Sequence, residues 1–188
     1  MAQHYIDIQL RPEPELAAHH LLSALYARLH LALVELRADA IGVSFPGFDA
    51  SRPSLGNCMR LLGTAPDLAA LMALPWLRGL RDHVAISDAQ PVPLHAPHRT
   101  LRRVQVKSSP ERLRRRLMKR HQLTQAQARE RIPDSAAKLT DLPFVVLPSA
   151  STGHRFRLFL ALGAQDSAPC EGGFNAYGLS STATVPWF

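Results

Sequence analysis

The stretch HYIDIQLRPEPELAAHHLLSALYARLHLALVEL, residues 4–36, decides the fold because it joins a strand pattern to a helix pattern across a breaker. At its start Ile6, Ile8 and Leu10 alternate with other side chains, which is the period of a half-buried strand. After RPEPE, leucines recur at helical spacing and predict a core-facing stripe on one helix. They are Leu22, Leu25, Leu29, Leu33 and Leu36. We therefore expect the fold to start with a strand and an amphipathic helix.

Three more strands and a second helix are predicted before residue 90. The strands are AIGVSFP (40–46), CMRLLG (58–63) and DHVAIS (82–87), and the helix is APDLAALMAL (65–74). Asp67 is the expected N-cap of that helix. The order β-α-β-β-α-β predicts an α+β protein whose domain 1–90 is ferredoxin-like, with two helices on one face of a four-stranded sheet.

A Pro-rich segment at 91–98 is the expected linker to a smaller α+β domain at 99–188. This domain opens with TLRRVQVK at 100–107, which alternates as a strand does. A basic helix at 110–121 follows, and LTQAQARERIP, with capping-box spacing at its start, predicts a further helix. The strand-like pieces PFVVLPS, RFRLFLALG, GGFNAYGLS and TVPWF complete the domain.

Positive charge is concentrated in one segment. The chain carries +7, but residues 99–131 hold twelve Lys or Arg and two acids, a net +10, so the remainder carries −3. Such localisation indicates a polyanionic partner, because bound phosphates offset the repulsion between the cations.

The cysteines and histidines predict neither a disulfide framework nor a metal site. Cys58 and Cys170 lie far apart without CxxC spacing, and His95 and His98 are a lone pair in the Pro-rich segment. We therefore expect no metal, no other cofactor, and the reduced cytoplasm as the location. No apolar run approaches the ~20 residues of a membrane span, so no membrane partner is expected.

The basic helix at 110–121 carries most of its cations on one side. At about 100° per residue, five of them share roughly 140° of the helix surface. Leu113 and Leu117 lie beside this arc and give the helix an apolar edge for docking, while Arg114 and His121 lie farther round. The five cations are Arg112, Arg115, Arg116, Lys119 and Arg120.

A helix of this kind suits a nucleic-acid groove, because guanidinium forks pair with phosphate oxygens or guanine edges. Charge runs are more often solvated faces, but here only Glu111 lies nearby to relieve the repulsion. The pattern leaves DNA and RNA open. The major groove of regular A-form RNA is too deep and narrow to read, whereas a short hairpin opens near its loop or end.

Three segments carry a resemblance to a known family: RVQVKSSPERLRRRLMKRH at 103–121, PSASTGHRFRLFL at 148–160 and GGFNAYGLSSTATVPWF at 172–188. Together they resemble the CRISPR-associated endoribonuclease of the type I-F (Csy) system, and the resemblance runs over essentially the whole chain. It implies a metal-independent enzyme that cuts CRISPR precursor RNA at the 3′ base of the repeat hairpin and leaves a 2′,3′-cyclic phosphate and a 5′-hydroxyl. It also implies that the protein stays on the mature guide RNA and joins other subunits of a surveillance complex.

The resemblance assigns three catalytic positions. The family's histidine matches His30 in ALYARLHLAL, its serine matches Ser149, and its tyrosine matches Tyr177 in NAYGLS. We expect His30 to act as general base toward the 2′-hydroxyl, Ser149 to hold the ribose, and Tyr177 to orient the histidine or the nucleotide. By residue type alone, His30 would be taken for a half-exposed surface histidine at the boundary of the leucine stripe.

Other positions are expected to bind RNA. Phe156 matches the aromatic that stacks under the closing base pair of the stem, although its place in an alternating strand also fits the core. Arg103 and Gln105 match the pair that reads base edges, and Arg suits guanine as Gln suits adenine. Lys119 stands where an arginine is expected, so a phosphate contact is predicted for it. The full set is Arg103, Gln105, Lys107, Arg112, Arg115, Arg116, Lys119, Arg120, His121, Ser151, Thr152 and Phe156.

Two rival functions fit the same sequence features. One is a non-catalytic subunit that binds an RNA hairpin within a ribonucleoprotein complex. The other is a DNA-binding regulator that places the basic helix in B-DNA. Cleavage of repeat RNA separates the enzyme from the first rival, and competition by duplex DNA at matched salt tests the second.

Overall fold

The computed structural model of the protein describes residues 3–105, 110–133, 141–149 and 153–188. These residues form helices and antiparallel strands, so the predicted α+β class is confirmed. Within these ranges, no helix is both long and apolar enough to cross a membrane.

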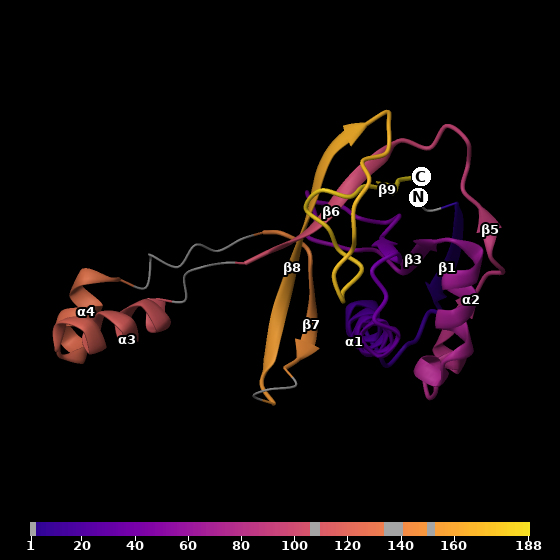
Figure 1. The fold of residues 1–188 in the computed structure, drawn as a ribbon. Coiled ribbons are helices and arrows are strands. Elements are labelled where there is room, and N and C mark those ends of the chain that lie inside the picture. The colour runs from indigo at the N-terminus through magenta and orange to yellow at the C-terminus, as the bar shows by residue number, and fades with distance from the viewer. Residues whose placement is uncertain (1–2, 106–109, 134–140, 150–152) are drawn as a thin grey trace. The chain divides into compact units, whose positions relative to one another are not determined.

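Strand β1 (His4–Leu10) lies in the middle of the N-terminal sheet (Figure 1). The strand order is β2-β3-β1-β4, β5 also pairs with β1, and every pairing is antiparallel. The other strands are β2 (Gly42–Ser44), β3 (Cys58–Gly63), β4 (Val84–Ile86) and β5 (Gln90–Pro91). Ile6, Ile8 and Leu10 are buried, as their alternation predicted.

Helices α1 (Ala18–Leu36) and α2 (Ala65–Ala73) alternate with these strands along the chain in the predicted order. The short 3₁₀ helices η1 (Pro75–Leu77) and η2 (Arg81–His83) follow α2. The predicted N-cap Asp67 is wrong, because Thr64 caps α2 and its hydroxyl accepts from the Asp67 N–H at 3.3 Å. Thr64 stands three residues before the acid, which is the spacing of a capping box. The ferredoxin-like assignment of 1–90 stays a prediction.

A second antiparallel sheet has the strand order β7-β8-β6-β9. Its strands are β6 (His98–Val104), β7 (Phe144–Pro148), β8 (Arg155–Asp166) and β9 (Val185–Pro186). The prediction of a strand for GGFNAYGLS, residues 172–180, is wrong, because this segment forms a loop with a turn. The loop conformation has a local cause: the Asn175 side chain accepts hydrogen bonds from backbone N–H groups, and Gly178 has a positive φ of 69°.

Helix α1 is held by both sheets. Its predicted leucine stripe faces the core: it is buried from Leu22 to Leu33, with Leu25 1% and Leu29 0% exposed, and partly buried at Leu36. The Ser23 hydroxyl accepts a hydrogen bond from the Val146 N–H of β7 at 3.0 Å, and buried leucines of β7 and β8 join the same core as α1. Because full burial of one leucine contributes about 1.5–3 kcal/mol, this packing fixes the helix that carries His30.

The chain forms two compact units, 1–104 with 142–188, and 105–141. The larger unit contains both sheets, since the second sheet shares its core with α1. These units therefore divide the chain at other places than the predicted domains 1–90 and 99–188. The predicted domain boundaries stay a prediction.

The smaller unit is built around two helices, α3 (Pro110–His121) and α4 (Gln125–Arg131) (Figure 1). The bounds of α3 are those predicted for the basic helix. The predicted capping box of α4 is also confirmed: the Thr124 hydroxyl accepts from the Gln127 N–H at 3.3 Å, and the Gln127 side chain accepts from the Thr124 N–H at 3.0 Å. The sequence also predicts Ser109 as the cap of this helix, because Pro110 follows it at the first helical position, and Ser109 lies outside the described residues.

Candidate functional site

The His30 imidazole has a defined tautomer. Its Nδ1 lies 2.7 Å from the carbonyl oxygen of Ala176, and a carbonyl can only accept a hydrogen bond. Nδ1 therefore carries the proton, and in the neutral ring Nε2 keeps its lone pair. The arrangement leaves Nε2 as the ring atom that can take up a proton.

Tyr177 lies flat against this imidazole. The two rings are 4.0 Å apart between centroids and are inclined by 12°. Both residues are partly exposed, so the pair lies at the protein surface. The stack restricts tilting of the imidazole out of its plane. The hydrogen bond at Nδ1 restricts rotation within that plane, and so the direction in which Nε2 points.

The loop that supplies both contacts, residues 175–179, is closed by its own hydrogen bonds. The side-chain oxygen of Asn175 accepts from the N–H groups of Tyr177 at 2.9 Å and Leu179 at 3.3 Å. The Gly178 N–H donates to the Asn175 carbonyl at 2.8 Å. The Gly178 carbonyl accepts from the Val43 N–H of β2 at 3.0 Å, which ties the loop to the N-terminal sheet.

Tyr26 binds the same loop from within α1. Its side chain is fully buried, and its hydroxyl donates to the carbonyl of Tyr177 at 2.7 Å. Burial raises the pKa of Tyr26 well above its usual value, and the nearby Tyr177 raises it further. The hydroxyl therefore stays protonated and remains a donor.

Neither Tyr26 nor Asn175 was among the residues predicted from the sequence. Tyr26 precedes His30 by four positions, which places both on one face of a helix. In NAYG, Asn175 and Gly178 stand at the first and fourth positions of a typical turn. The sequence therefore contains both signals, the i, i+4 spacing on α1 and the turn residues of NAYG, but the segment 172–180 was predicted to be a strand.

Ser149 directly follows β7, the strand that packs against α1. Its N–H donates to the His154 carbonyl at 2.8 Å, and its own carbonyl accepts from the Gly153 N–H at 2.9 Å. These bonds close the connection between β7 and β8. Ser151 and Thr152 lie outside the described residues. The catalytic role of Ser149 stays a prediction.

Arg103 and Phe156 come together on the second sheet. The guanidinium carbon of Arg103 lies 5.7 Å from the ring centroid of Phe156, within cation–π range. Phe156 is half-buried against the core, and Arg103 is exposed at the end of β6. Gln105, just beyond β6, is exposed, while Lys107 lies outside the described residues.

The surface of α3 follows the predicted division. Leu113 and Leu117 are half-buried and form the apolar edge. Arg114 is only 7% exposed, and its Nε donates to the Ile132 carbonyl at 2.7 Å, so this cation stabilises the helix pair. The predicted RNA contacts Arg115, Arg116, Lys119, Arg120 and His121 are exposed, and the side chain of Arg112 is not among those described.

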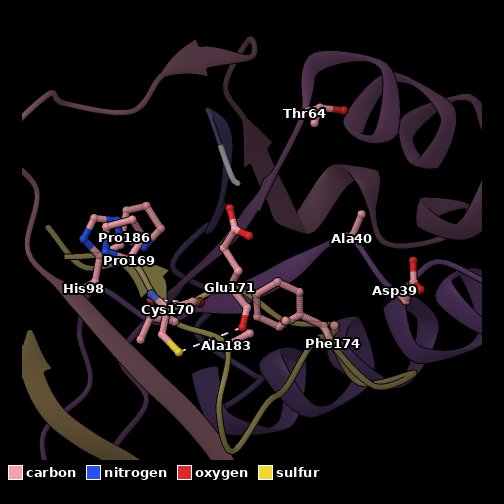
Figure 2. Close-up of a pocket in the computed structure, with 13 residues that line it drawn as sticks. Asp39, Ala40, Thr64, His98, Pro169, Cys170, Glu171, Phe174, Ala183 and Pro186 are labelled. Atoms are coloured by element: carbon pink, nitrogen blue, oxygen red, sulfur yellow. Dashed lines mark hydrogen bonds between the residues drawn. The ribbon is translucent and has the colours of Figure 1, made fainter.

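A separate pocket of about 440 Å³ lies between the C-terminal segment and the start of β6 (Figure 2). His98, Cys170, Glu171 and Phe174 are among its lining residues, and burial lowers the pKa of His98. The lining includes neither His30 nor any other predicted site residue. Across the described residues, no group of three or more His, Cys, Asp or Glu is arranged to hold a metal ion.

Comparison with known proteins gives a match over nearly the whole chain. Residues 5–188 match the family model described as CRISPR-associated protein (Cas_Csy4). The chain is 54% identical over 185 residues to the CRISPR-associated endonuclease Cas6/Csy4 of Pseudomonas aeruginosa (strain UCBPP-PA14), covering 98% of this chain and 99% of the relative. It is 43% identical over 185 residues to the protein of the same name from Escherichia coli (strain UTI89 / UPEC), with the same coverage. The similarity therefore spans α1, the loop 175–179 and α3.

Proposed function

The chain belongs to the Cas_Csy4 family of CRISPR-associated proteins, and we propose that it is an endoribonuclease that cuts CRISPR precursor RNA at the 3′ base of the repeat hairpin. Its relatives from two bacteria are named as CRISPR-associated endonucleases. The observation that carries the proposal is the hydrogen bond from Nδ1 of His30 to the Ala176 carbonyl, because it leaves Nε2 as a base.

The proposed reaction uses the hydroxyl of the substrate as nucleophile. Nε2 of His30 takes the proton from the 2′-hydroxyl, and O2′ attacks the adjacent phosphorus. The bond from phosphorus to O5′ breaks, and O5′ takes up one proton. The products are a 2′,3′-cyclic phosphate and a 5′-hydroxyl, so this route needs neither a metal ion nor water as a reactant.

Positioning of the imidazole and of the attacking nucleotide supplies the rest of the rate enhancement. Tyr177 holds the plane of the imidazole through the 4.0 Å stack, and Ser149 is proposed to hold the ribose of the attacking nucleotide. In-line attack requires the 2′-hydroxyl, the phosphorus and O5′ to be nearly collinear. Fixed groups on a folded scaffold lower the entropy cost of that alignment.

Binding of the hairpin is assigned to residues outside this catalytic cluster. The exposed cations of α3 are proposed to contact the stem, with Lys119 on a phosphate. Phe156 is proposed to stack under the closing base pair, and Arg103 and Gln105 to read base edges at the foot of the stem. The 5.7 Å contact of Arg103 with Phe156 supports a joint role, since both are then directed to the same end of the stem.

The same residues that are proposed to bind the hairpin also account for retention of the product. Cleavage at the foot of the stem leaves the hairpin contacts intact, so we expect the protein to remain on the mature guide RNA. The bound RNA would then link it to other protein subunits of the type I-F complex.

Cleavage of a labelled repeat hairpin by the purified protein tests this function. We expect one discrete cut at the 3′ side of the stem, unaffected by EDTA, and no cut when the attacking nucleotide is 2′-deoxy. The deoxy substrate should still bind, because the residues assigned to binding contact the stem and not the attacking 2′-hydroxyl. Cleavage of the deoxy substrate, or loss of cleavage in EDTA, would contradict the mechanism.

His30→Ala separates catalysis from binding. We expect no measurable cleavage and unchanged affinity for the hairpin, because His30 lies on α1 and not among the residues assigned to the stem. His20→Ala, at an exposed position of the same helix, is the matched control and should cleave normally. Hairpin binding without cleavage by the wild-type protein would instead indicate a non-catalytic RNA-binding subunit.

A further inference from the structure

We propose that Tyr26 and Asn175 are positioning residues for the cleavage proposed above: together they hold the Ala176 carbonyl where it fixes the tautomer of His30. Neither residue is assigned to the substrate. Both act through the loop 175–179, and the inference rests on the proposed role of His30 as a base.

The first support comes from α1. Tyr26 and His30 stand one helical turn apart, and each donates to the loop: the Tyr26 hydroxyl to the Tyr177 carbonyl and Nδ1 of His30 to the Ala176 carbonyl, both at 2.7 Å. Two consecutive carbonyls of one loop are thus fixed to two positions of one helix. Because one face of α1 is buried in the core that it shares with both sheets, the helix is a rigid support for both bonds.

The second support comes from the loop itself. Asn175 accepts from the N–H groups of Tyr177 and Leu179, so its side chain fixes the Ala176–Tyr177 peptide plane, which also carries the Ala176 carbonyl, and the Gly178–Leu179 peptide plane. Without this acceptor both N–H groups would need other partners, and the loop would lose the conformation that directs the Ala176 carbonyl toward α1. The tautomer of His30 therefore depends on two side chains whose hydrogen bonds go to the loop backbone and not to the imidazole.

The Tyr26 hydroxyl is separable from the packing of its ring. The ring is fully buried near Phe45, with 5.9 Å between centroids, and Tyr26→Phe keeps this apolar contact. Burial raises the pKa of Tyr26 well above its usual value, so the hydroxyl keeps its proton and donates at neutral pH. Its removal leaves the Tyr177 carbonyl without this donor and frees the loop to shift.

The test combines cleavage with a direct measurement of the tautomer. Single-turnover cleavage of the repeat hairpin and hairpin affinity are measured for wild type and Tyr26→Phe, and ¹⁵N NMR of the histidine rings is recorded on the free proteins. His30 is assigned by the signal lost in His30→Gln. We expect Tyr26→Phe to cleave roughly ten- to a hundredfold more slowly, as misplacement of a catalytic group does. Affinity should not change, and the His30 signal should shift toward the tautomer with the proton on Nε2.

Tyr5→Phe is the matched control. Tyr5 lies on β1 against Phe188 and carries a hydroxyl remote from the loop, so its removal should change neither cleavage nor the His30 signal. If Tyr26→Phe cleaves at the wild-type rate, or if its His30 tautomer is unchanged, the inference is overturned.

A second pair of variants keeps the inference testable should Tyr26→Phe fail to fold. Asn175→Ser retains a neutral acceptor for backbone N–H groups, whereas Asn175→Val removes it. We expect Asn175→Ser to keep most of the cleavage that Asn175→Val loses, with the His30 tautomer following the same order. Equal behaviour of the two variants would refute the role of the acceptor.

Failure of the proposed function has a different signature. Wild-type protein that binds but does not cut the hairpin would refute the enzyme, whereas the NMR measurement needs no RNA and still decides whether Tyr26 and Asn175 fix His30.

Discussion

Gly178→Ala should destabilise the protein for two reasons, a left-handed backbone and a steric clash with β2. Gly178 has φ of 69°, and a Cβ added there would lie 2.5 Å from Cγ2 of Val43 and 3.3 Å from the carbonyl oxygen of Ile41. The left-handed backbone alone costs an alanine about 1–2 kcal/mol. Overpacking against β2 adds about 1–3 kcal/mol, so we expect a total loss of about 2–5 kcal/mol in the free energy of unfolding.

Gly79→Ala isolates the two contributions. Gly79 has φ of 79°, but nothing lies within 4 Å of an added Cβ. This variant should therefore lose only the backbone part, about 1–2 kcal/mol. Both glycines lie in the larger compact unit, so denaturant unfolding followed by tryptophan fluorescence reports on one structure for both.

The same substitution, Gly178→Ala, should also affect the rate of RNA cleavage. Gly178→Ala should slow single-turnover cleavage even under conditions where it is fully folded, because the shifted loop carries the Ala176 carbonyl and the Tyr177 ring. Val43→Ala removes the methyl group that the new Cβ would meet, so the double variant should lose less stability than the sum of the single variants. Equal losses for Gly178→Ala and Gly79→Ala, or strict additivity with Val43→Ala, would refute the steric reasoning.

Two further predictions concern the helix pair and the thiols. Arg116→Gln should weaken hairpin binding, and the slope of log K against log salt should fall by about the amount that one phosphate contact contributes. Arg114→Gln should mainly lower the free energy of unfolding of the helix pair, because the Nε of Arg114 donates to the Ile132 carbonyl. Binding across a salt series and denaturant unfolding measure the two effects, and equal salt slopes for wild type and Arg116→Gln would contradict the assignment. Burial first, and the Asp7 charge next, raise the pKa of Cys58 to about 11, so iodoacetamide at pH 8 should modify the exposed Cys170 well before Cys58, as peptide mass spectrometry would measure.

The regular elements were predictable where apolar residues repeat. The leucine stripe of α1 lies where its helical period places it, and the strand CMRLLG and the basic helix have the predicted bounds. The division of α3 into an exposed cationic face and an apolar edge also followed from helical geometry. Burial of Arg114 did not, because its partner is the Ile132 carbonyl at the end of α4, and a main-chain acceptor leaves no trace in the sequence.

The cluster of His30, Tyr177 and the loop 175–179 was only partly predictable, because main-chain groups hold it together. His30 and Tyr177 were identified through a resemblance, and their stacking joins residues far apart in the chain. The segment 172–180 was mistaken for a strand, whereas its conformation depends on the Asn175 side chain and on the positive φ of Gly178. Asp67 was placed at a cap that Thr64 occupies, which is an error of three residues at a helix boundary.

The hydrogen bond between His30 and Ala176 joins residues 146 positions apart, and this separation has a consequence for synthesis. A ribosome delivers α1 early and the α3 cations midway, but the carbonyl that sets the imidazole comes near the end. A nascent or truncated chain therefore carries the helix proposed to bind RNA before it has the carbonyl that fixes the His30 tautomer. On the proposed function, RNA affinity is acquired during translation, whereas the proposed cleavage depends on nearly the whole chain.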